Sequence, residues 1–204
     1  MKLYYMPGAC SLATHILLRE TGAKFDIERV GRDKKTETGA DFMAINPKGY
    51  VPALQLDDGE IVTENVVLHG YVADSKPDAK LAPAHGTRAR LKQDELAVYI
   101  STEIHKGYSP LFNPAITEEG RKAAIERLTS RYNLIEQHLS DGRPYLTGDN
   151  FATVDAYLFT VTNWSTPLKI DLSAFPNVMA FQKRVAGRKA VQEAMIAEGL
   201  IKAA

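Results

Sequence analysis

A single cysteine lies where a thiol could take part in a reaction. Cys10 follows a strand-like apolar run, residues 2–6, and a Pro-Gly turn, and it precedes a helical pattern over residues 11–22. A thiol at a helix N-terminus faces free backbone N–H groups and the positive end of the helix dipole. Both favour the thiolate and lower the thiol pKa from its free value of about 8.5. Because free cysteine is also among the most buried residue types, position alone leaves two interpretations, a nucleophile and a small core residue.

A Val-Pro pair offers a second chemical feature. Val51 and Pro52 open a hairpin signature over residues 50–63, with Asp-Gly at its turn. A cis peptide bond before Pro52 would turn the N–H and C=O of Val51 outward, where they could pair with an extended peptide. An ordinary proline at the start of an edge strand explains the same residues.

An acidic residue and an amide open the next helical pattern, residues 64–74. Asn65 is a strong N-cap residue, and the N–H groups of a helix start can hold a carboxylate. Glu64 beside it could bind an ammonium group, so the pair could hold both ends of an amino acid. Ordinary capping with an acid near the helix dipole is the alternative interpretation.

A histidine lies in the middle of the chain. His105 and Lys106 are expected to end a helix just before Gly107, with Glu103 two residues earlier. Histidine can act in acid–base catalysis, or it can compensate the dipole of a helix C-terminus. The sequence has no G-x-S-x-G elbow, no zinc-ligand spacing, no P-loop and no G-x-G-x-x-G fingerprint, so we expect no metal and no nucleotide site.

Composition narrows the functional classes. Lys+Arg and Asp+Glu both number 25, and the resulting net charge of zero argues against a nucleic-acid-binding protein. No apolar run approaches the roughly 20 residues that span a bilayer. A lone cysteine cannot form an intrachain disulfide. We therefore expect a cytoplasmic protein that binds neither nucleic acid nor membrane.

The pattern of elements predicts two domains. The first part alternates short strands and helices in the order β-α-β-α-β-β-α, which predicts a compact α/β domain over residues 1–76. Residues 77–87 contain Pro and Gly without periodicity and are expected to be a linker. An all-helical domain is expected over residues 88–204, including a buried helix at 152–164. The segment "ATVD" that opens this helix has Ala152 at the cap, where a capping box would have Ser or Thr.

Together these features resemble a known family. The chain is similar to bacterial beta-class cytosolic glutathione S-transferases, which have a thioredoxin-like N-terminal domain followed by a C-terminal helical-bundle domain. The resemblance extends over essentially the whole chain and is carried by four segments, namely "MKLYYMPGACSLATHILLRE", "KKTETGADFMAINPKGYVPAL", "STEIHKGYSPLF" and "AEGL".

The resemblance implies a glutathione site and a role for its residues. Cys10 would lie near the glutathione sulfur and form a mixed disulfide with it, and His105 would be the class's catalytic histidine. Glu103 would reach across a homodimer to the partner's glutathione. Tyr5 matches the activating tyrosine of other classes, although it is not the activating group in this class. The glutathione-binding residues would be Tyr5, Lys34, Val51, Pro52, Glu64, Asn65, Glu103 and Lys106.

The implied activity is conjugation of glutathione thiolate to small hydrophobic electrophiles, a detoxification reaction. The pocket for the electrophile is expected in the helical domain, with Tyr108, Phe112 and Trp164 as its candidates. Ordinary core or interface aromatics are the alternative for these three residues. Two other functions stay open: a glutathione-dependent thioltransferase or peroxidase, and a non-catalytic protein that binds hydrophobic ligands.

Overall fold

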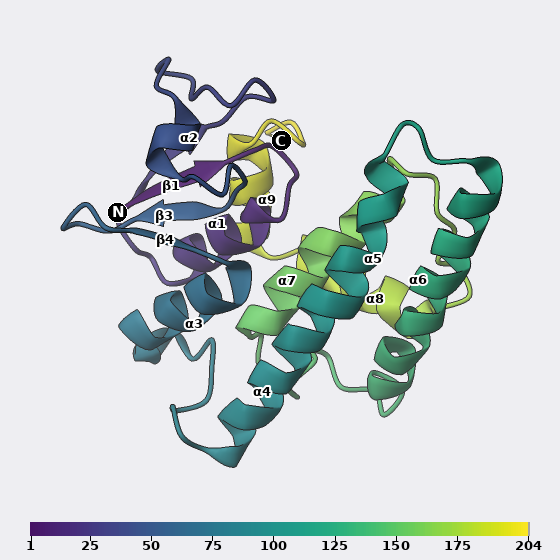
Figure 1. Cartoon of the computed structure of the whole chain (residues 1–204). Coiled ribbons are helices and arrows are strands. Elements are labelled where there is room, and N and C mark those ends of the chain that lie inside the picture. Colours follow the sequence, from purple (N-terminus) through teal and green to yellow (C-terminus); the bar gives the residue numbers. More distant parts are fainter. Residues whose placement is uncertain (204) are drawn as a thin grey trace. The chain divides into compact units, whose positions relative to one another are not determined.

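The computed structural model describes residues 1–203, and it divides the chain into two compact units (Figure 1). The first unit contains Met1–Ala79 together with the chain from Arg188 onward, and the second contains Lys80–Gly187.

The first unit is built on a four-stranded mixed sheet. Its strand order is β2-β1-β3-β4, with β1 parallel to β2 and antiparallel to β3, and β3 antiparallel to β4. In the register of the sheet, Leu3 lies between Ile27 and Leu54. The strands are β1 (Lys2–Tyr5), β2 (Asp26–Arg29), β3 (Ala53–Gln55) and β4 (Ile61–Thr63).

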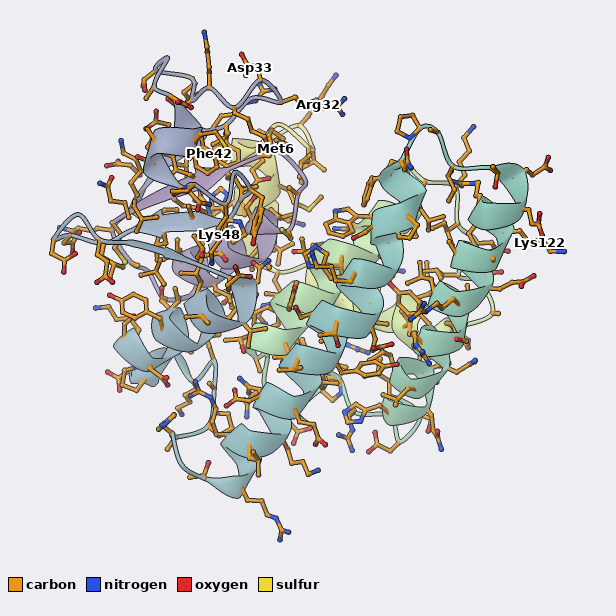
Figure 2. All side chains as sticks on the ribbon, viewed as in Figure 1. Met6, Arg32, Asp33, Phe42, Lys48 and Lys122 are labelled. Carbon is orange, nitrogen blue, oxygen red and sulfur yellow. The ribbon has the colours of Figure 1, made fainter. Side chains whose placement is uncertain are left out.

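Successive side chains of β1 point to opposite faces of the sheet, and apolar residues lie on both faces. Tyr4 packs against Phe42 of α2 (Phe42–Ile45), with a distance of 5.8 Å between the ring centroids, and Met6 joins this cluster (Figure 2). Tyr5 points to the other face, where its ring contacts His15 of α1 (Ser11–Glu20). Helix α1 packs in turn against α3 (Asn65–Ser75). The predicted β-α-β-α-β-β-α order is therefore present in this unit.

The chain end belongs to this unit and not to the helical one. Helix α9 (Lys189–Ala197) packs along α1, and Figure 1 shows it in yellow beside the purple helix. Nε of Arg188 lies 2.7 Å from Oε1 of Glu20, which ties the start of α9 to the end of α1. The expected helical domain over residues 88–204 therefore extended too far, because an apolar helix pattern does not say which unit buries it.

The second unit is a bundle of helices, several of which contribute to its core. All ten residues of α7 are buried, as the apolar pattern predicted, and Leu128, Tyr132 and Ile135 form the buried stripe of α6. No helix among the described residues has the length and apolar character needed to cross a lipid bilayer. The main helices are α4 (Arg88–Tyr99), α5 (Lys106–Tyr108), α6 (Glu118–His138), α7 (Thr153–Thr162) and α8 (Pro176–Ala186).

The helix that carries His105 does not end there, contrary to the expectation. A π-helical segment, η2 (Ile100–His105), continues α4 directly into α5, and a 3₁₀ turn, η3 (Ser109–Phe112), follows. Gly107 instead permits a close approach, since a Cβ at this position would lie 3.0 Å from a methyl carbon of Leu128. π-Helical turns are rare and occur often at functional sites.

The start of α7 is only half capped. The carboxylate of Asp155 accepts the backbone N–H of Ala152 at 2.7 Å and that of Leu146 at 2.8 Å. Alanine has no side-chain oxygen, so the reciprocal bond from residue 152 to the N–H of Asp155 is missing.

We expect Ala152→Ser to raise the free energy of unfolding by about 1 kcal/mol, because it completes the capping box. Urea denaturation measures this change. The matched control is Ala156→Ser, which adds a hydroxyl inside the same buried helix, away from its start, and should lower stability. Equal or lower stability of Ala152→Ser would show that the site has no room for the hydroxyl.

Candidate functional site

The lone thiol lies beside the predicted peptide-binding edge. Cys10 is the N-cap residue of α1, and its Sγ donates a hydrogen bond to the carbonyl oxygen of Val51 at 3.3 Å. The peptide bond between Val51 and Pro52 is cis, as the Val-Pro pair suggested. Residues about 40 positions apart in the chain are therefore brought together at the start of α1. The thiol is half-buried and is not part of a disulfide.

A charged pair lies at the start of α3. Glu64 has a φ of 73° in the left-handed region, where a side chain is strained, and it is the N-cap residue of the helix. Its Oε1 lies 2.8 Å from Nζ of Lys48, which is labelled in Figure 2. The same Nζ donates to the hydroxyl of Thr63 at 2.7 Å, and the Tyr50 hydroxyl lies 3.4 Å from Oε1. The pair is about half exposed, so its partners can exchange.

Asn65 is not the cap that the sequence suggested. It is the first residue of α3, and its Oδ1 accepts a hydrogen bond from the hydroxyl of Thr14 at 3.3 Å. Both side chains are buried. This bond joins the start of α3 to the middle of α1, so the amide supports the site through its connection to the cysteine helix.

Two more predicted residues of this unit have partners of their own. Lys34 has a φ of 63°, and its Nζ donates to the carbonyl oxygen of Gly49 at 2.5 Å. Tyr5 is 6% exposed, and burial raises its pKa, as does the nearby carboxylate of Glu198. The raised pKa keeps this phenol protonated.

The histidine of the second unit is held in an aromatic setting. Nδ1 of His105 lies 2.7 Å from the hydroxyl of Tyr157, and its ring meets Trp164 edge-on with 5.0 Å between centroids. Burial, together with the charge of Lys106, lowers the pKa of His105 to about 4. The imidazole is therefore neutral at physiological pH and offers a hydrogen bond instead of a positive charge.

Glu103 has a partner within its own chain. Its Oε2 lies 2.8 Å from Nε of Arg131 on α6. Glu103 and Lys106 also line a small surface pocket of about 160 Å³, together with Arg127.

The three predicted pocket aromatics differ in exposure. Trp164 is in ring contact with both Tyr108 and Phe112, at 5.6 and 5.3 Å between centroids. Tyr108 is fully buried, its hydroxyl is 2.9 Å from that of Tyr132, and burial raises its pKa. Tyr108 is therefore a core residue that supports Trp164, whereas Phe112 is 53% exposed and open to solvent.

Comparisons with known proteins identify the family. The model described as "Glutathione S-transferase, N-terminal domain" matches residues 8–75, and "Glutathione S-transferase, C-terminal domain" matches residues 99–189. "Glutathione S-transferase GstA" of Escherichia coli O157:H7 is 45% identical over 201 residues, which cover 98% of this chain and 100% of that protein. The chain belongs to the glutathione S-transferase family. Glutathione is its co-substrate.

Solved structures agree with the sequence match. "Bacterial beta class Sphingomonas chungbukensis Glutathione S-transferase" is 44% identical, with a TM-score of 0.94 over 98% of this chain and 100% of the other. A sphingomonad glutathione S-transferase, described as complexed with glutathione, is 42% identical, with the same score and coverage. These findings confirm the expected resemblance to the beta class and the expected fold, a thioredoxin-like domain followed by a helical domain.

Sequence reasoning missed several residues around the predicted positions of this glutathione S-transferase. Lys48, Thr14 and Tyr157 each contact a predicted residue directly. Only Lys48 has a signal in the sequence, a cation close to the Val-Pro pair. The other two lie inside helices, where their spacing predicts burial only. No group of three metal-ligating side chains is gathered within residues 1–203.

We expect His105 to remain neutral across the physiological range. In imidazole NMR spectra, its resonances should not titrate between pH 5.5 and 8, and their midpoint should lie near pH 4. Loss of the signals in His105→Gln assigns them. The same histidine in urea-unfolded protein should titrate near its ordinary value of about 6.5. A folded-state midpoint near 6.5 would contradict the buried, neutral imidazole.

Proposed function

We propose that this glutathione S-transferase conjugates glutathione to small hydrophobic electrophiles in detoxification, and that Cys10 anchors glutathione and exchanges disulfides with it. One observation carries the proposal: the Cys10 thiol donates to the carbonyl of Val51, next to the cis bond to Pro52. The Val51 oxygen therefore belongs to the proposed peptide-pairing edge and also accepts the hydrogen bond of the Cys10 thiol.

Glutathione is an extended tripeptide with a central cysteine, which suits this arrangement. In the proposed complex, its cysteinyl N–H donates to the Val51 oxygen and replaces the Cys10 thiol there. The glutathione sulfur then lies near Sγ of Cys10. Exchange with glutathione disulfide forms the Cys10–glutathione disulfide and releases one glutathione thiol, so no further oxidant is needed.

The charged groups of the first unit suit the two ends of the tripeptide. The γ-glutamyl ammonium would take the place of Lys48 on Glu64, a pair that is exposed enough to exchange. The γ-glutamyl carboxylate would accept N–H groups at the start of α3. Lys34 would turn from the Gly49 carbonyl to the glycyl carboxylate.

Conjugation needs the glutathione thiolate and an apolar surface for its acceptor. The thiolate displaces a leaving group such as chloride from carbon, so that an S–C bond forms, and the thiol proton passes to solvent. His105 would contribute through a hydrogen bond as a neutral group. Phe112 and Trp164 are the proposed acceptor contacts, and Lys106 a polar contact to glutathione.

Cys10→Ala separates the proposed activities. We expect the variant to lose turnover of a glutathione mixed disulfide and to keep conjugation of a chloronitrobenzene within about tenfold of wild type, about 1.4 kcal/mol in activation free energy. The physical reason is that disulfide exchange requires an attacking thiol, whereas conjugation uses the thiol of glutathione itself. Initial rates with both substrates measure this.

The controls identify the alternative functions. Cys10→Ser keeps the size and polarity of the side chain and should behave as Cys10→Ala does. Loss of both activities in both variants would make Cys10 the activating group. Turnover of the mixed disulfide alone by wild type would favour a thioltransferase, and turnover of neither substrate would favour a binding protein.

We further propose a homodimer in the cytoplasm. Each unit has a helix on which two large apolar side chains are exposed. These are Val67 and Tyr71 on α3, at 55% and 42%, and Leu91 and Val98 on α4, at 65% and 51%. Spacings of four and seven place each pair on one helix face. Such faces are typical of association surfaces, and a free thiol suits a reducing compartment.

Light scattering tests the dimer. Wild type should have twice the 22.5 kDa mass of the chain, and Leu91→Glu should shift it toward the monomer, because burying a charge without a partner is unfavourable. Ile201→Glu is the control, since it adds the same charge at a 40% exposed apolar residue near the chain end. A monomeric wild type would contradict the dimer.

A further inference from the structure

The chain end contributes a buried carboxylate to the turn that precedes Cys10. Glu198 follows α9, and its side chain is fully buried. Its Oε2 accepts the backbone N–H of Gly8 at 2.9 Å, and its Oε1 lies 2.9 Å from Nδ1 of His15, which is also fully buried. One carboxylate therefore joins the chain end, the cysteine turn and the middle of α1.

A third residue fixes the direction of these hydrogen bonds. Nε of Arg19 donates to Nε2 of His15 at 3.0 Å. Because an arginine can only donate, Nε2 must accept, and the proton of a neutral imidazole then lies on Nδ1. His15 therefore donates to Glu198, and each carboxylate oxygen has a donor from a different part of the unit.

The turn itself is confined from a second side. Gly8 has a φ of 69°, which favours glycine, and a Cβ there would lie 3.3 Å from a methyl carbon of Leu200. The next N–H, that of Ala9, donates to the carbonyl of Met6 at 3.0 Å. Cys10 follows directly, so the carboxylate and the leucine hold the backbone on which the thiol is mounted.

We propose that Glu198 is a positioning residue for Cys10 and for glutathione binding. The inference rests on the proposed function, which places glutathione beside this turn. Burial of a carboxylate is unfavourable unless donors satisfy it, and here one of the two donors is the backbone of the cysteine turn. The segment after α9 therefore acts as part of the glutathione-binding unit.

Helix α9 provides a matched control for this carboxylate. Glu193 is 44% exposed and makes two long ion pairs, 3.7 Å to Arg19 and 3.7 Å to Lys189. Glu193→Gln removes a carboxylate charge from α9 itself, just before Glu198, without touching the turn. Glu198→Gln removes one acceptor, because its new amide N–H₂ meets a donor on either side.

The test measures glutathione kinetics and the alkylation of Cys10 by iodoacetamide, with and without glutathione. We expect Glu198→Gln to raise the KM for glutathione about tenfold, the equivalent of one lost hydrogen bond to a charged group, while kcat changes less than threefold. The KM should change more than kcat because saturating glutathione restores the geometry of the turn. Protection of Cys10 should require correspondingly more glutathione, and Glu193→Gln should match wild type.

A rescue experiment distinguishes positioning by hydrogen bonds from loss of packing. Arg19→Leu in the Glu198→Gln background lets the proton of His15 move to Nε2, so that Nδ1 can accept from the new amide. The KM should then fall back toward the wild-type value. A KM that stays raised in the double variant would overturn the hydrogen-bond mechanism.

The remaining outcomes separate this inference from the proposed function. If glutathione fails to protect Cys10 in wild type, the proposed site is wrong and the inference falls with it. If wild type is protected and Glu198→Gln matches Glu193→Gln, only the positioning role is overturned. Should Glu198→Gln not fold, Leu200→Ala decides: a raised KM supports the inference, and an unchanged KM overturns it.

Discussion

Burial of helix α1 is the constraint on which the first unit depends. Ser11–Leu18 are all buried, so the helix lies among the sheet, α3 and α9 with almost no face toward solvent. A helix enclosed in this way cannot shift without disturbing its neighbours. Because Cys10 begins this helix, each neighbour also fixes the place of the thiol. The hydrogen bond from Thr14 to Asn65 and the ion pair of Glu20 with Arg188 extend the same restraint to α3 and α9.

Two carboxylates near this helix differ in burial, and the difference suits one to a structural role and the other to ligand binding. Glu198 is fully buried, and both of its oxygens contact donors within the unit, so its carboxylate is enclosed by the protein. Glu64 is half exposed, and its principal partner is the flexible, solvated ammonium of Lys48. A ligand ammonium can replace that lysine at little cost. The buried acid therefore holds the site, and the exposed one is suited to exchange its partner.

Buried polar groups of the second unit are also hydrogen-bonded to one another. The hydroxyls of Tyr108, Tyr132 and Thr162 form a buried chain, with two contacts of 2.9 Å each, and burial raises the pKa of Tyr132 to about 12. These groups stabilise the core and do not titrate in the physiological range. His105 lies on the π-helical segment, outside this chain, and its low pKa leaves it neutral. A neutral His105 can therefore act on its neighbours through directed hydrogen bonds, but not through a positive charge.

The sequence by itself determined the elements and their order. Period-two and period-three-to-four patterns predicted the strands, the helices and the buried α7. Local signatures made Cys10, Val51 and Pro52 candidate site residues, each with a structural alternative. Only the tertiary structure decided which distant groups meet. In the structure α9 packs on α1, and Glu64, not Asn65, is the N-cap residue of α3. The helix continues past His105. Glu198 contacts Gly8, which lies 190 positions away in the chain. Local spacing has no information about such contacts, because they depend on how whole faces pack together.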